Sequence, residues 1–385
     1  MFDRTSASVN IHYMNDPIGR HDATSISCIS AILKAGDIVT GVRGTTDENV
    51  VLTGAKGTGN GTQSAPFLYE GPLTSAADGA AVSVLTPSFP GVTTAVFYGP
   101  DTHSFNPETI PAGQVRAVGS YRSSASPPGV LNRGMIYLGP VSGPGGSWTS
   151  IDVPADGRDT VGGVRACPGT RPDCFVVNTI AHSTMGNLVV GNYDLNPGGP
   201  GDEVSFNAFI YNMATRQWTL LQLGGSLASK TTIYGIWQNG GPASPDYTLA
   251  GGSALPGHQQ ALLMNYNERT GAFGEPAFYS YGNARERVVT HFDGITAVPG
   301  GFNLVAVSSE QASSMAFVPA TGDEHSFGPA TWYPIDVGAS PLCPDGCGKV
   351  TGNTVYQNKV MGLYTQAGSM VPRTYLATVP PRTQR

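Results

Sequence analysis

The sequence predicts an all-β fold, a β-propeller of six blades with four antiparallel strands each, and three observations support it. Glycine and proline are abundant, 51 and 30 of 385 residues, yet apolar runs with alternating polarity recur between them, as in turn-rich β structure. Four-strand units repeat every 45 to 60 residues, roughly the period of propellers and similar arrays. No segment has the 3.6-residue periodicity of a long helix. A ring of such sheets buries both apolar faces of each blade.

The clearest unit begins at Thr231 and contains four short apolar runs. The first run is followed by a Gly-rich turn, and the third ends in Asn-Glu-Arg-Thr-Gly at 267–271. Both turns are typical of hairpins between antiparallel strands. We therefore expect one blade here, with strands at 233–237, 247–251, 261–266 and 277–281.

The remaining units follow the same plan in chain order. The expected strands of the first unit are 37–44, 49–57, 65–71 and 81–87, and those of the second unit are 93–99, 114–121, 133–139 and 147–154. The third unit has expected strands at 174–186, 187–194, 207–217 and 218–223, and the fifth unit at 288–301, 302–309, 314–323 and 330–336. The sixth unit has only three, at 348–358, 359–365 and 373–380. The apolar run 25–33 makes the start of the first unit ambiguous. Five blades is the alternative, if the first two units merge.

The last unit lacks one strand, and a spare alternating segment, SVNIHY at 8–13, stands near the beginning of the sequence. We expect this segment to complete the last blade, because the pairing closes the ring and removes an exposed strand edge. Residues 1–385 then form a single propeller domain.

The sequence pattern of the repeated units also resembles that of a known group of propellers. The fourth unit combines Thr-x-x-Gly-Ile at 232–236, a Gly-containing second strand, and a third strand ending in Tyr-Asn-x-x-Thr-Gly at 266–271. This texture resembles the repeats of secreted fungal propellers, and is similar to the hetero-Diels-Alderase propellers of fungal tropolone-sesquiterpene pathways. The resemblance implies an enzyme of secondary metabolism that performs a dehydration or cycloaddition without a cofactor. No residue here matches a catalytic motif of that family, so none is carried over.

The cysteines suggest an oxidising compartment. Cys167 and Cys174, and likewise Cys343 and Cys347, lie close together in Pro/Gly/Asp-rich loops, so we expect two local disulfides in a secreted glycoprotein. A zinc site made by all four is the alternative, which their wide separation and the lack of nearby histidines disfavour. The triplet Asn60-Gly61-Thr62 is a glycosylation acceptor.

Composition excludes several partners. Charged residues are 12% of the chain and the net charge is −6, so no basic stripe is available for a nucleic acid. No run of about 18 apolar residues predicts a membrane span. The first residues do not have the pattern of a signal peptide, which fits either a cytosolic protein or a secreted protein written without its leader. The cysteine pairs favour the secreted protein. The oligomeric state is left open.

The first strand of each propeller blade lines the central channel, where ligands bind in many propellers. His291 and Asp293 stand on the same face of one such strand, so they are the expected catalytic acid/base pair. A purely structural hydrogen bond is the alternative. The expected substrate-binding residues on these strands are Tyr98, Asn178, His182, Tyr234, Trp237, Gln238, Asn353 and Tyr356. The aromatic side chains would form apolar walls, or would pack between blades.

Common catalytic motifs are missing: there is no Gly-x-Ser-x-Gly, no phosphate-binding loop and no His-Glu-x-x-His. A calcium site from Asp194, Asp202 and Glu203 lacks the EF-hand spacing, so we expect no metal and no cofactor. The sequence favours an enzyme acting on a small, largely apolar molecule, a cyclase or lyase. The alternatives are a glycan-binding, lectin-like propeller and, third, a propeller glycoside hydrolase, which would need more carboxylates than the expected channel offers.

Overall fold

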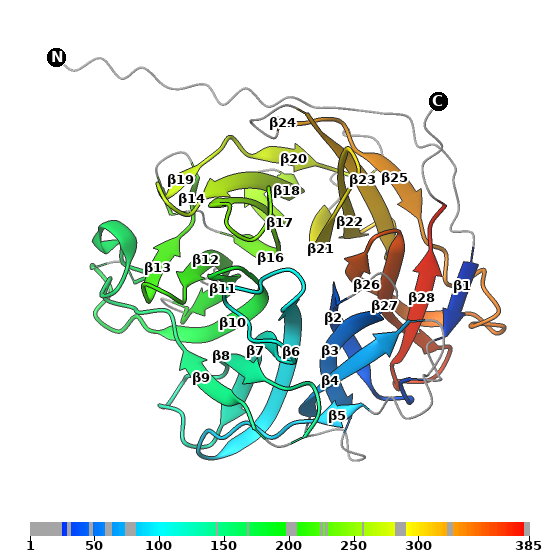
Figure 1. Ribbon diagram of the computed structural model, residues 1–385, viewed down its shortest axis with the longest axis horizontal. Coiled ribbons are helices and arrows are strands. Elements are labelled where there is room, and N and C mark those ends of the chain that lie inside the picture. Colours follow the sequence, from blue (N-terminus) through cyan, green and yellow to red (C-terminus); the bar gives the residue numbers. More distant parts are fainter. Residues whose placement is uncertain are drawn as a thin grey trace.

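The computed structural model describes residues 25–380, except 29–31, 46–48, 58–63, 74–81, 144, 168, 198–205, 224–225, 228–229, 256–257, 282–289 and 322–325. Six antiparallel sheets surround a central axis (Figure 1). This arrangement confirms the predicted six-bladed propeller. The one helical segment in the described ranges is a short 3-10 turn, η1 (Val161–Gly163).

Each blade is a meander that runs outward from the axis, and the last blade takes its outer strand from the beginning of the chain. The inner strands are β2 (Ile38–Gly44), β6 (Val92–Thr102), β10 (Val176–Met185), β16 (Thr231–Gln238), β21 (Thr290–Val298) and β26 (Cys347–Tyr356). The second strands are β3 (Asn49–Gly57), β7 (Val115–Ser123), β11 (Leu188–Leu195), β17 (Asp246–Leu255), β22 (Gly301–Ser308) and β27 (Lys359–Gln366).

The third strands are β4 (Ser64–Pro72), β8 (Arg133–Gly139), β12 (Phe206–Asn212), β18 (His258–Asn267), β23 (Ser314–Thr321) and β28 (Arg373–Thr378). The outer strands are β5 (Ser83–Val84), β9 (Ser147–Ile151), β13 (Gln217–Leu220), β19 (Ala272–Phe273) with β20 (Ala277–Tyr279), β24 (Ser326–Phe327) with β25 (Thr331–Pro334), and β1 (Ser25–Cys28). Blades 4 and 5 thus have a split outer strand. A small hairpin, β14 (Gln222–Leu223) and β15 (Ser226–Leu227), follows blade 3.

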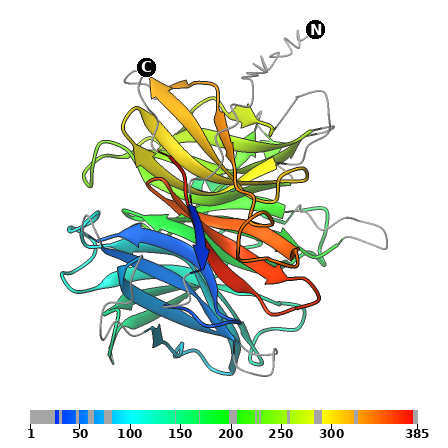
Figure 2. The same cartoon turned by 90° about the vertical axis from the view of Figure 1, so that its right-hand side faces the viewer.

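The ring is closed by β1, which pairs antiparallel with β28, Ser25 lying opposite Thr378. Figure 2 shows β1, dark blue, alongside the red strands of the last blade. An N-terminal strand therefore closes the ring as expected, but the assignment of that strand to residues 8–13 was wrong. Residues 25–28 occupy the free edge of β28, and residues 8–13 lie outside the described residues. A short edge strand needs little more than alternation, which both segments have.

The core is divided among the six interfaces between neighbouring blades, each of which holds one cluster of buried apolar side chains. Between blades 4 and 5, for example, Leu263, Phe292 and Trp332 are buried together. Burial of a large apolar side chain stabilises a fold by about 1.5–3 kcal/mol. Stacking of the blades is therefore what holds the inner strands, and the side chains they present, in place.

A glycine recurs on the second strand of five blades because the inner strand comes very close there. A Cβ atom at Gly191 would lie 2.0 Å from the carbonyl oxygen of Ile180, and one at Gly362 would lie 1.9 Å from that of Thr351. The corresponding position of blade 5 is Ala306, opposite Phe292. This contact explains why the second strands are so similar in sequence.

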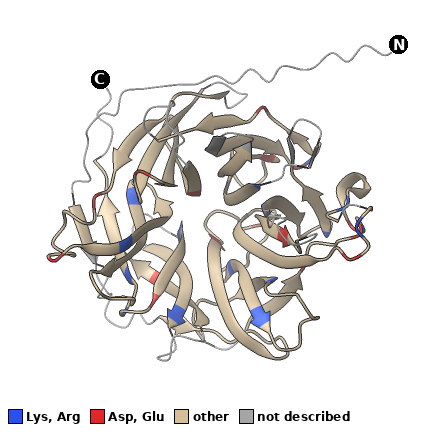
Figure 3. Ribbon diagram, turned by 180° about the vertical axis from the view of Figure 1, so that it is seen from behind, with Lys and Arg blue, Asp and Glu red and all other residues tan. Residues whose placement is uncertain are grey.

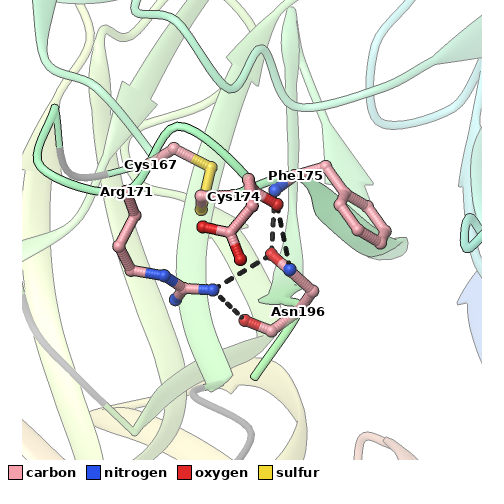
Figure 4. The surroundings of a disulfide bond; sticks show 6 residues. Cys167, Arg171, Cys174, Phe175 and Asn196 are labelled. Atoms are coloured by element: carbon pink, nitrogen blue, oxygen red, sulfur yellow. Dashed lines mark hydrogen bonds between the residues drawn. A yellow bond between two sulfur atoms is a disulfide. The ribbon is translucent and has the colours of Figure 1, made fainter. Parts of the chain in front are cut away.

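Two disulfides, Cys167–Cys174 and Cys343–Cys347, confirm the predicted pairs and overturn the zinc alternative. Around the first, Arg171 donates to the carbonyl oxygen of Asn196 at 2.9 Å, and the backbone N–H of Phe175 donates to the Asn196 side chain at 2.8 Å (Figure 4). The bridge and these bonds fasten the loop before β10 to the end of β11.

Charged positions are scattered along the blades, with no stripe of Lys and Arg in the view of Figure 3. Within the described ranges, no helix has the length and apolar character needed to cross a membrane. The glycosylation acceptor Asn60 lies outside the described residues.

Candidate active site at the channel

Every inner strand carries a β-bulge at the equivalent position, and the bulged residue faces the channel. The register shifts fall at Val39/Gly41, Phe97/Gly99, Ala181/Ser183, Ile233/Gly235, Phe292/Gly294 and Gly352/Thr354. Both neighbours of each bulged residue are buried, whereas the bulged residue itself is half-buried. We call these residues the bulge ring: Thr40, Tyr98, His182, Tyr234, Asp293 and Asn353. Bulges turn side chains and are common beside active sites.

Four consecutive blades bring aromatic and imidazole rings into contact along one arc of the channel. The ring centroids of Tyr98 and His182 are 4.8 Å apart, those of His182 and Tyr234 are 4.2 Å apart, and those of Tyr234 and His291 are 5.6 Å apart. His291 stands two residues before Asp293 on β21. The structure thus brings together the predicted residues Tyr98, His182, Tyr234, His291 and Asp293 in a continuous row.

The other two ring members fasten blades together. The hydroxyl of Thr40 donates to the carbonyl oxygen of Phe97, and the side-chain amide of Asn353 donates to that of Val39 at 2.7 Å. The ring is therefore asymmetric: blades 2 to 5 present titratable and aromatic groups, while blades 6 and 1 present groups engaged in inter-blade hydrogen bonds.

His291 and Asp293 form an ion pair, with 2.9 Å between Nε2 and Oδ1. Their side chains are 33% and 18% exposed, so solvent or a ligand can reach both. Burial lowers the pKa of His291, but the charge and hydrogen bond of Asp293 outweigh it and raise that pKa above 6.5. The carboxylate thus favours the protonated imidazole, and an imidazole oriented by a carboxylate suits a general acid or base.

The two neighbouring groups, His182 and Tyr234, have pKa values shifted so that both are uncharged at neutral pH. Burial lowers the pKa of His182 to about 3. A hydrogen bond of 2.7 Å between its Nε2 and Asn192 Oδ1 opposes this shift. Burial and the charge of Asp293 raise the pKa of Tyr234 to about 12. At neutral pH His182 is an uncharged imidazole and Tyr234 a phenol, so both offer hydrogen bonds without carrying charge.

Aromatic and cationic side chains meet at the mouth where the inner strands end. The loop from β6 to β7 reaches over this mouth toward β16 (Figure 1), and Phe105 on that loop meets Trp237 edge-to-face at 5.5 Å. The guanidinium of Arg43 lies 5.0 Å from the ring centroid of Trp237 and 5.8 Å from that of Phe105. We call Arg43, Phe105 and Trp237 the plug.

The buried carboxyl group of Asp101 binds the loop that carries the plug residue Phe105. Asp101 is fully buried, accepts two bonds from the Asn106 amide at 2.9 and 2.8 Å, and lies 3.7 Å from Arg116. Burial raises the pKa of Asp101, and the charges of Arg43 and Arg116 oppose that rise. Since a buried charge needs partners, these contacts hold the loop across the mouth. His291 lies toward the other mouth, near the beginning of its inner strand β21.

Between the bulge ring and the plug lies a small cavity of about 30 Å³, bordered by Tyr98, His182, Tyr234 and Asp293 on the ring side and by Arg43 on the plug side. Such a volume holds roughly two water molecules. This cavity by itself is therefore too small to hold a whole substrate molecule.

The remaining predicted residues lie apart from the arc. Trp237 belongs to the plug, and Gln238 is buried and donates to the carbonyl oxygens of Pro242 and Ser244 at 2.9 and 2.7 Å. Tyr356 ends β26 beside Gly44. Asn178 donates to Asp194 Oδ2 at 2.7 Å. Thr40 and Arg43 were not among the residues predicted from the sequence. Thr40 could have been identified by its neighbours, because an apolar residue precedes it and a glycine follows it, as at Tyr98, Tyr234 and Asp293.

Across the described residues, no cluster of three or more His, Cys, Asp or Glu side chains has the geometry of a metal site. Asp202 and Glu203, two of the three ligands weighed for calcium, lie outside the described residues.

No protein-family model and no curated protein matches the chain. Among solved structures, the sialidase of Trypanosoma rangeli in complex with sialic acid aligns with a TM-score of 0.50 and 8% identity, over 94% of this chain and 60% of that one. A Hadza microbial sialidase aligns with 0.48 and 9%, over 89% and 66%. An ulvan lyase, a polysaccharide lyase bound to its sugar, aligns with 0.42 and 9%, over 88% and 78%.

The chain spans about 60% of the length of the Trypanosoma rangeli sialidase. At such low identity the likeness is one of fold alone. It places the chain among propellers of the architecture that sialidases use.

Proposed function

We propose that the protein is a cofactor-independent enzyme, a lyase or cyclase that moves a proton on a small organic molecule held in the channel beside His291. The observation that supports this most is the ion pair of His291 and Asp293, placed beside the uncharged Tyr234 and His182. A histidine oriented by a carboxylate, next to groups that offer hydrogen bonds without charge, is an arrangement that suits general acid–base catalysis.

The simplest reaction for this geometry is the dehydration of an alcohol. Neutral His291 removes a proton from the carbon next to an activating group, and Asp293 stabilises the imidazolium that forms. The C–O bond then breaks, a C=C bond forms, and the imidazolium gives the same proton to the leaving hydroxyl, which departs as water. The enzyme returns to its starting state. Tyr234, which keeps its proton, donates a hydrogen bond to the oxygen on which charge develops.

A cycloaddition that follows dehydration would need only positioning of the reactive alkene. The rings of Tyr98 and Tyr234 would supply apolar surface for this purpose. These side chains belong to different blades, so they would hold a planar substrate on more than one side.

Non-catalytic glycan binding is the second candidate, because tyrosine rings at a channel mouth also suit sugar rings. A lectin-like propeller would, however, repeat its site in each blade, whereas the six ring positions carry five different residue types. A glycoside hydrolase of the usual kind needs two carboxylates about 5–9 Å apart, and the bulge ring contains only Asp293.

Incubation of the purified protein with a metabolite extract, followed by untargeted mass spectrometry, separates these candidates. An enzyme of the proposed kind consumes a low-polarity metabolite and forms a product lighter by one water molecule. Oligosaccharides retained on the protein without conversion would refute the proposal in favour of glycan binding.

A further inference from the structure

Arg43 is a buried cation that has no carboxylate in direct contact among the described residues. It is 5% exposed, and its one hydrogen bond within these ranges runs from Nε to the carbonyl oxygen of Pro100, at 3.4 Å. The charge of Asp101 acts on Arg43, but Asp101 forms its ion pair with Arg116, at 3.7 Å. Two buried guanidinium groups thus share one buried carboxylate. Because a buried charge is costly unless it is paired, Arg43 is left in need of an anion.

The side chain of Arg43 forms the floor of the small cavity inside the bulge ring. It begins on blade 1, and its guanidinium lies 5.0 Å from the ring centroid of Trp237 on blade 4, the opposite blade of the ring (Figure 1). The side chain therefore crosses the channel. The cavity of about 30 Å³ is bordered by Arg43 and by neither Trp237 nor Phe105, so Arg43 separates it from the two aromatic rings.

Two buried hydroxyl groups belong to the walls of the same cavity. Ser183 is 8% exposed and Thr354 is 6% exposed, and neither hydroxyl forms a hydrogen bond within the described part of the chain. Each residue directly follows a bulged residue, at a position where the other four blades have glycine: Gly41, Gly99, Gly235 and Gly294. A hydroxyl group can donate one hydrogen bond. The cavity therefore combines a guanidinium with two further donors that lack a protein acceptor.

We propose that this cavity binds one small monovalent anion, such as chloride, beside the guanidinium of Arg43, with the hydroxyls of Ser183 and Thr354 as further donors. The volume holds roughly two water molecules, so it suits a single halide ion and excludes a phosphate or an organic acid of sugar size. A guanidinium is weakly hydrated and readily pairs with anions in buried places. The site is independent of the proposed function, because a protein without catalytic activity would bind the ion equally well.

Asp293 also borders the cavity, and its charge has to be balanced for an anion to bind. Its carboxylate is paired with His291, so a protonated imidazole cancels that charge. The other titratable groups on the cavity, Tyr98, His182 and Tyr234, are uncharged at neutral pH, because burial raises the pKa of both tyrosines and lowers that of the histidine. With His291 protonated, the guanidinium gives the cavity a net positive charge. Anion binding is therefore expected below the pKa of His291, which lies above 6.5.

The anomalous diffraction of bromide locates the ion directly. Crystals of the full chain, kept at about pH 6 so that His291 is protonated, are soaked in sodium bromide. We expect an anomalous peak in the cavity next to Arg43. Density without an anomalous signal would show that the cavity holds water only, and would overturn the inference.

The affinity is measured by thermal unfolding at constant ionic strength, with sodium chloride replacing sodium gluconate, whose anion is too large for the cavity. Chloride is expected to raise the unfolding midpoint, because it binds the folded state. Thr354→Val keeps the shape of the side chain and should weaken chloride binding by at least about 10-fold, as expected for the loss of a hydrogen bond to a charged group. Thr351→Val, on the same strand but not on the cavity, should leave the affinity unchanged.

Arg43→Met removes the charge and is expected to abolish the effect of chloride, while the exposed Arg158→Met retains it. If Arg43→Met does not fold, Thr354→Val and Ser183→Ala test the same site. Equal stabilisation of the wild type by chloride and gluconate would overturn the inference. So would an effect of chloride that is the same in the wild type and in the cavity variants, since the ion would then bind elsewhere.

Discussion

At the scale of single residues, the arc of rings along the channel contains three groups whose pKa values are shifted in different ways by their surroundings. His291 is paired with a carboxylate, His182 is buried without a charged partner of opposite sign, and Tyr234 lies next to Asp293. Desolvation and neighbouring charge act on each in a different proportion. As a result, His291 can carry a proton while its neighbours His182 and Tyr234 offer hydrogen bonds without charge.

The pKa of His291 is expected to depend on Asp293. Asp293→Asn removes the charge that raises this pKa and leaves the burial that lowers it, so the pKa should fall below 6.5. NMR titration of the imidazole measures it, with the exposed Glu275→Gln as control. In the wild type the raised pKa also means that protonation of His291 stabilises the fold below the unfolded-state pKa of about 6.5 and that this contribution fades as pH rises through the folded-state value. An unchanged titration in Asp293→Asn would contradict the ion pair.

His182 should make the fold sensitive to acid. Its folded-state pKa of about 3 lies below that of the unfolded chain, so stability is lost as the pH falls from about 6.5 toward 3. His182→Gln cannot take up the proton and is expected to lose less stability over this range. Thermal unfolding of both proteins at pH 7 and pH 4 measures the difference, and equal losses would show that His182 is not buried in its neutral form.

Sequence alone predicted most of the arc, because strand alternation put Tyr98, His182, Tyr234, His291 and Asp293 on channel-facing strands. It could not predict which of them the bulges turn inward. A bulge shifts the alternation of side chains by one residue. Trp237 was expected to form an apolar wall of the channel together with Tyr234, but beyond the bulge it lies in the plug. Where the bulge is not followed by glycine, as at His182, no local pattern marks it.

At the scale of elements, the close approach of inner and second strands makes a specific demand on the sequence. Gly191→Ala should destabilise the protein by about 1–3 kcal/mol, since the added Cβ would lie 2.0 Å from the carbonyl oxygen of Ile180. The corresponding position in blade 5 is Ala306, so Ala306→Gly serves as a control and should cost about 1 kcal/mol or less. Chemical denaturation gives both values. If Gly191→Ala is tolerated as well as Ala306→Gly, the close approach is not what selects glycine.

The plug is the second element whose energetics can be measured. Arg43→Met keeps much of the side-chain volume between Phe105 and Trp237 but leaves the buried Asp101 with one guanidinium fewer. Breaking a buried charge pair costs about 3–5 kcal/mol, and since Arg116 and Asn106 remain we expect the lower end. Arg158→Met, on the exposed surface, should change stability by less than about 0.5 kcal/mol. A loss below about 1 kcal/mol for Arg43→Met would mean that the loop is held without the guanidinium.

At the scale of the whole molecule, six similar sheets create a symmetric frame around an asymmetric site. The blades could be predicted from the sequence because their apolar pattern repeats. Closure of the ring by an N-terminal strand could also be predicted, because the last unit lacked one strand. The closing strand itself was not, since residues 8–13 and 25–28 alternate equally well and pairing over such a distance leaves no local trace.

Closure is expected to contribute to global stability through Ile26, which packs against the core cluster between blades 5 and 6. Ile26→Asp should lower the midpoint of thermal unfolding, by a destabilisation of about 1–3 kcal/mol. Ser27→Asp, the next residue on the same strand, is exposed and should have little effect. Equal effects of the two substitutions would indicate that β1 is not packed on the ring.

The central claim is that the bulge ring and the adjacent His291 form a catalytic site in which His291 carries the proton. The most direct measurement is the rate at which the wild type and His291→Gln dehydrate the metabolite identified in an extract, with the folded state of both checked by their melting temperatures. The account predicts conversion by the wild type, a loss of at least about 100-fold in the variant, and similar melting temperatures. Equal rates, or loss of activity only through loss of folding, would contradict it.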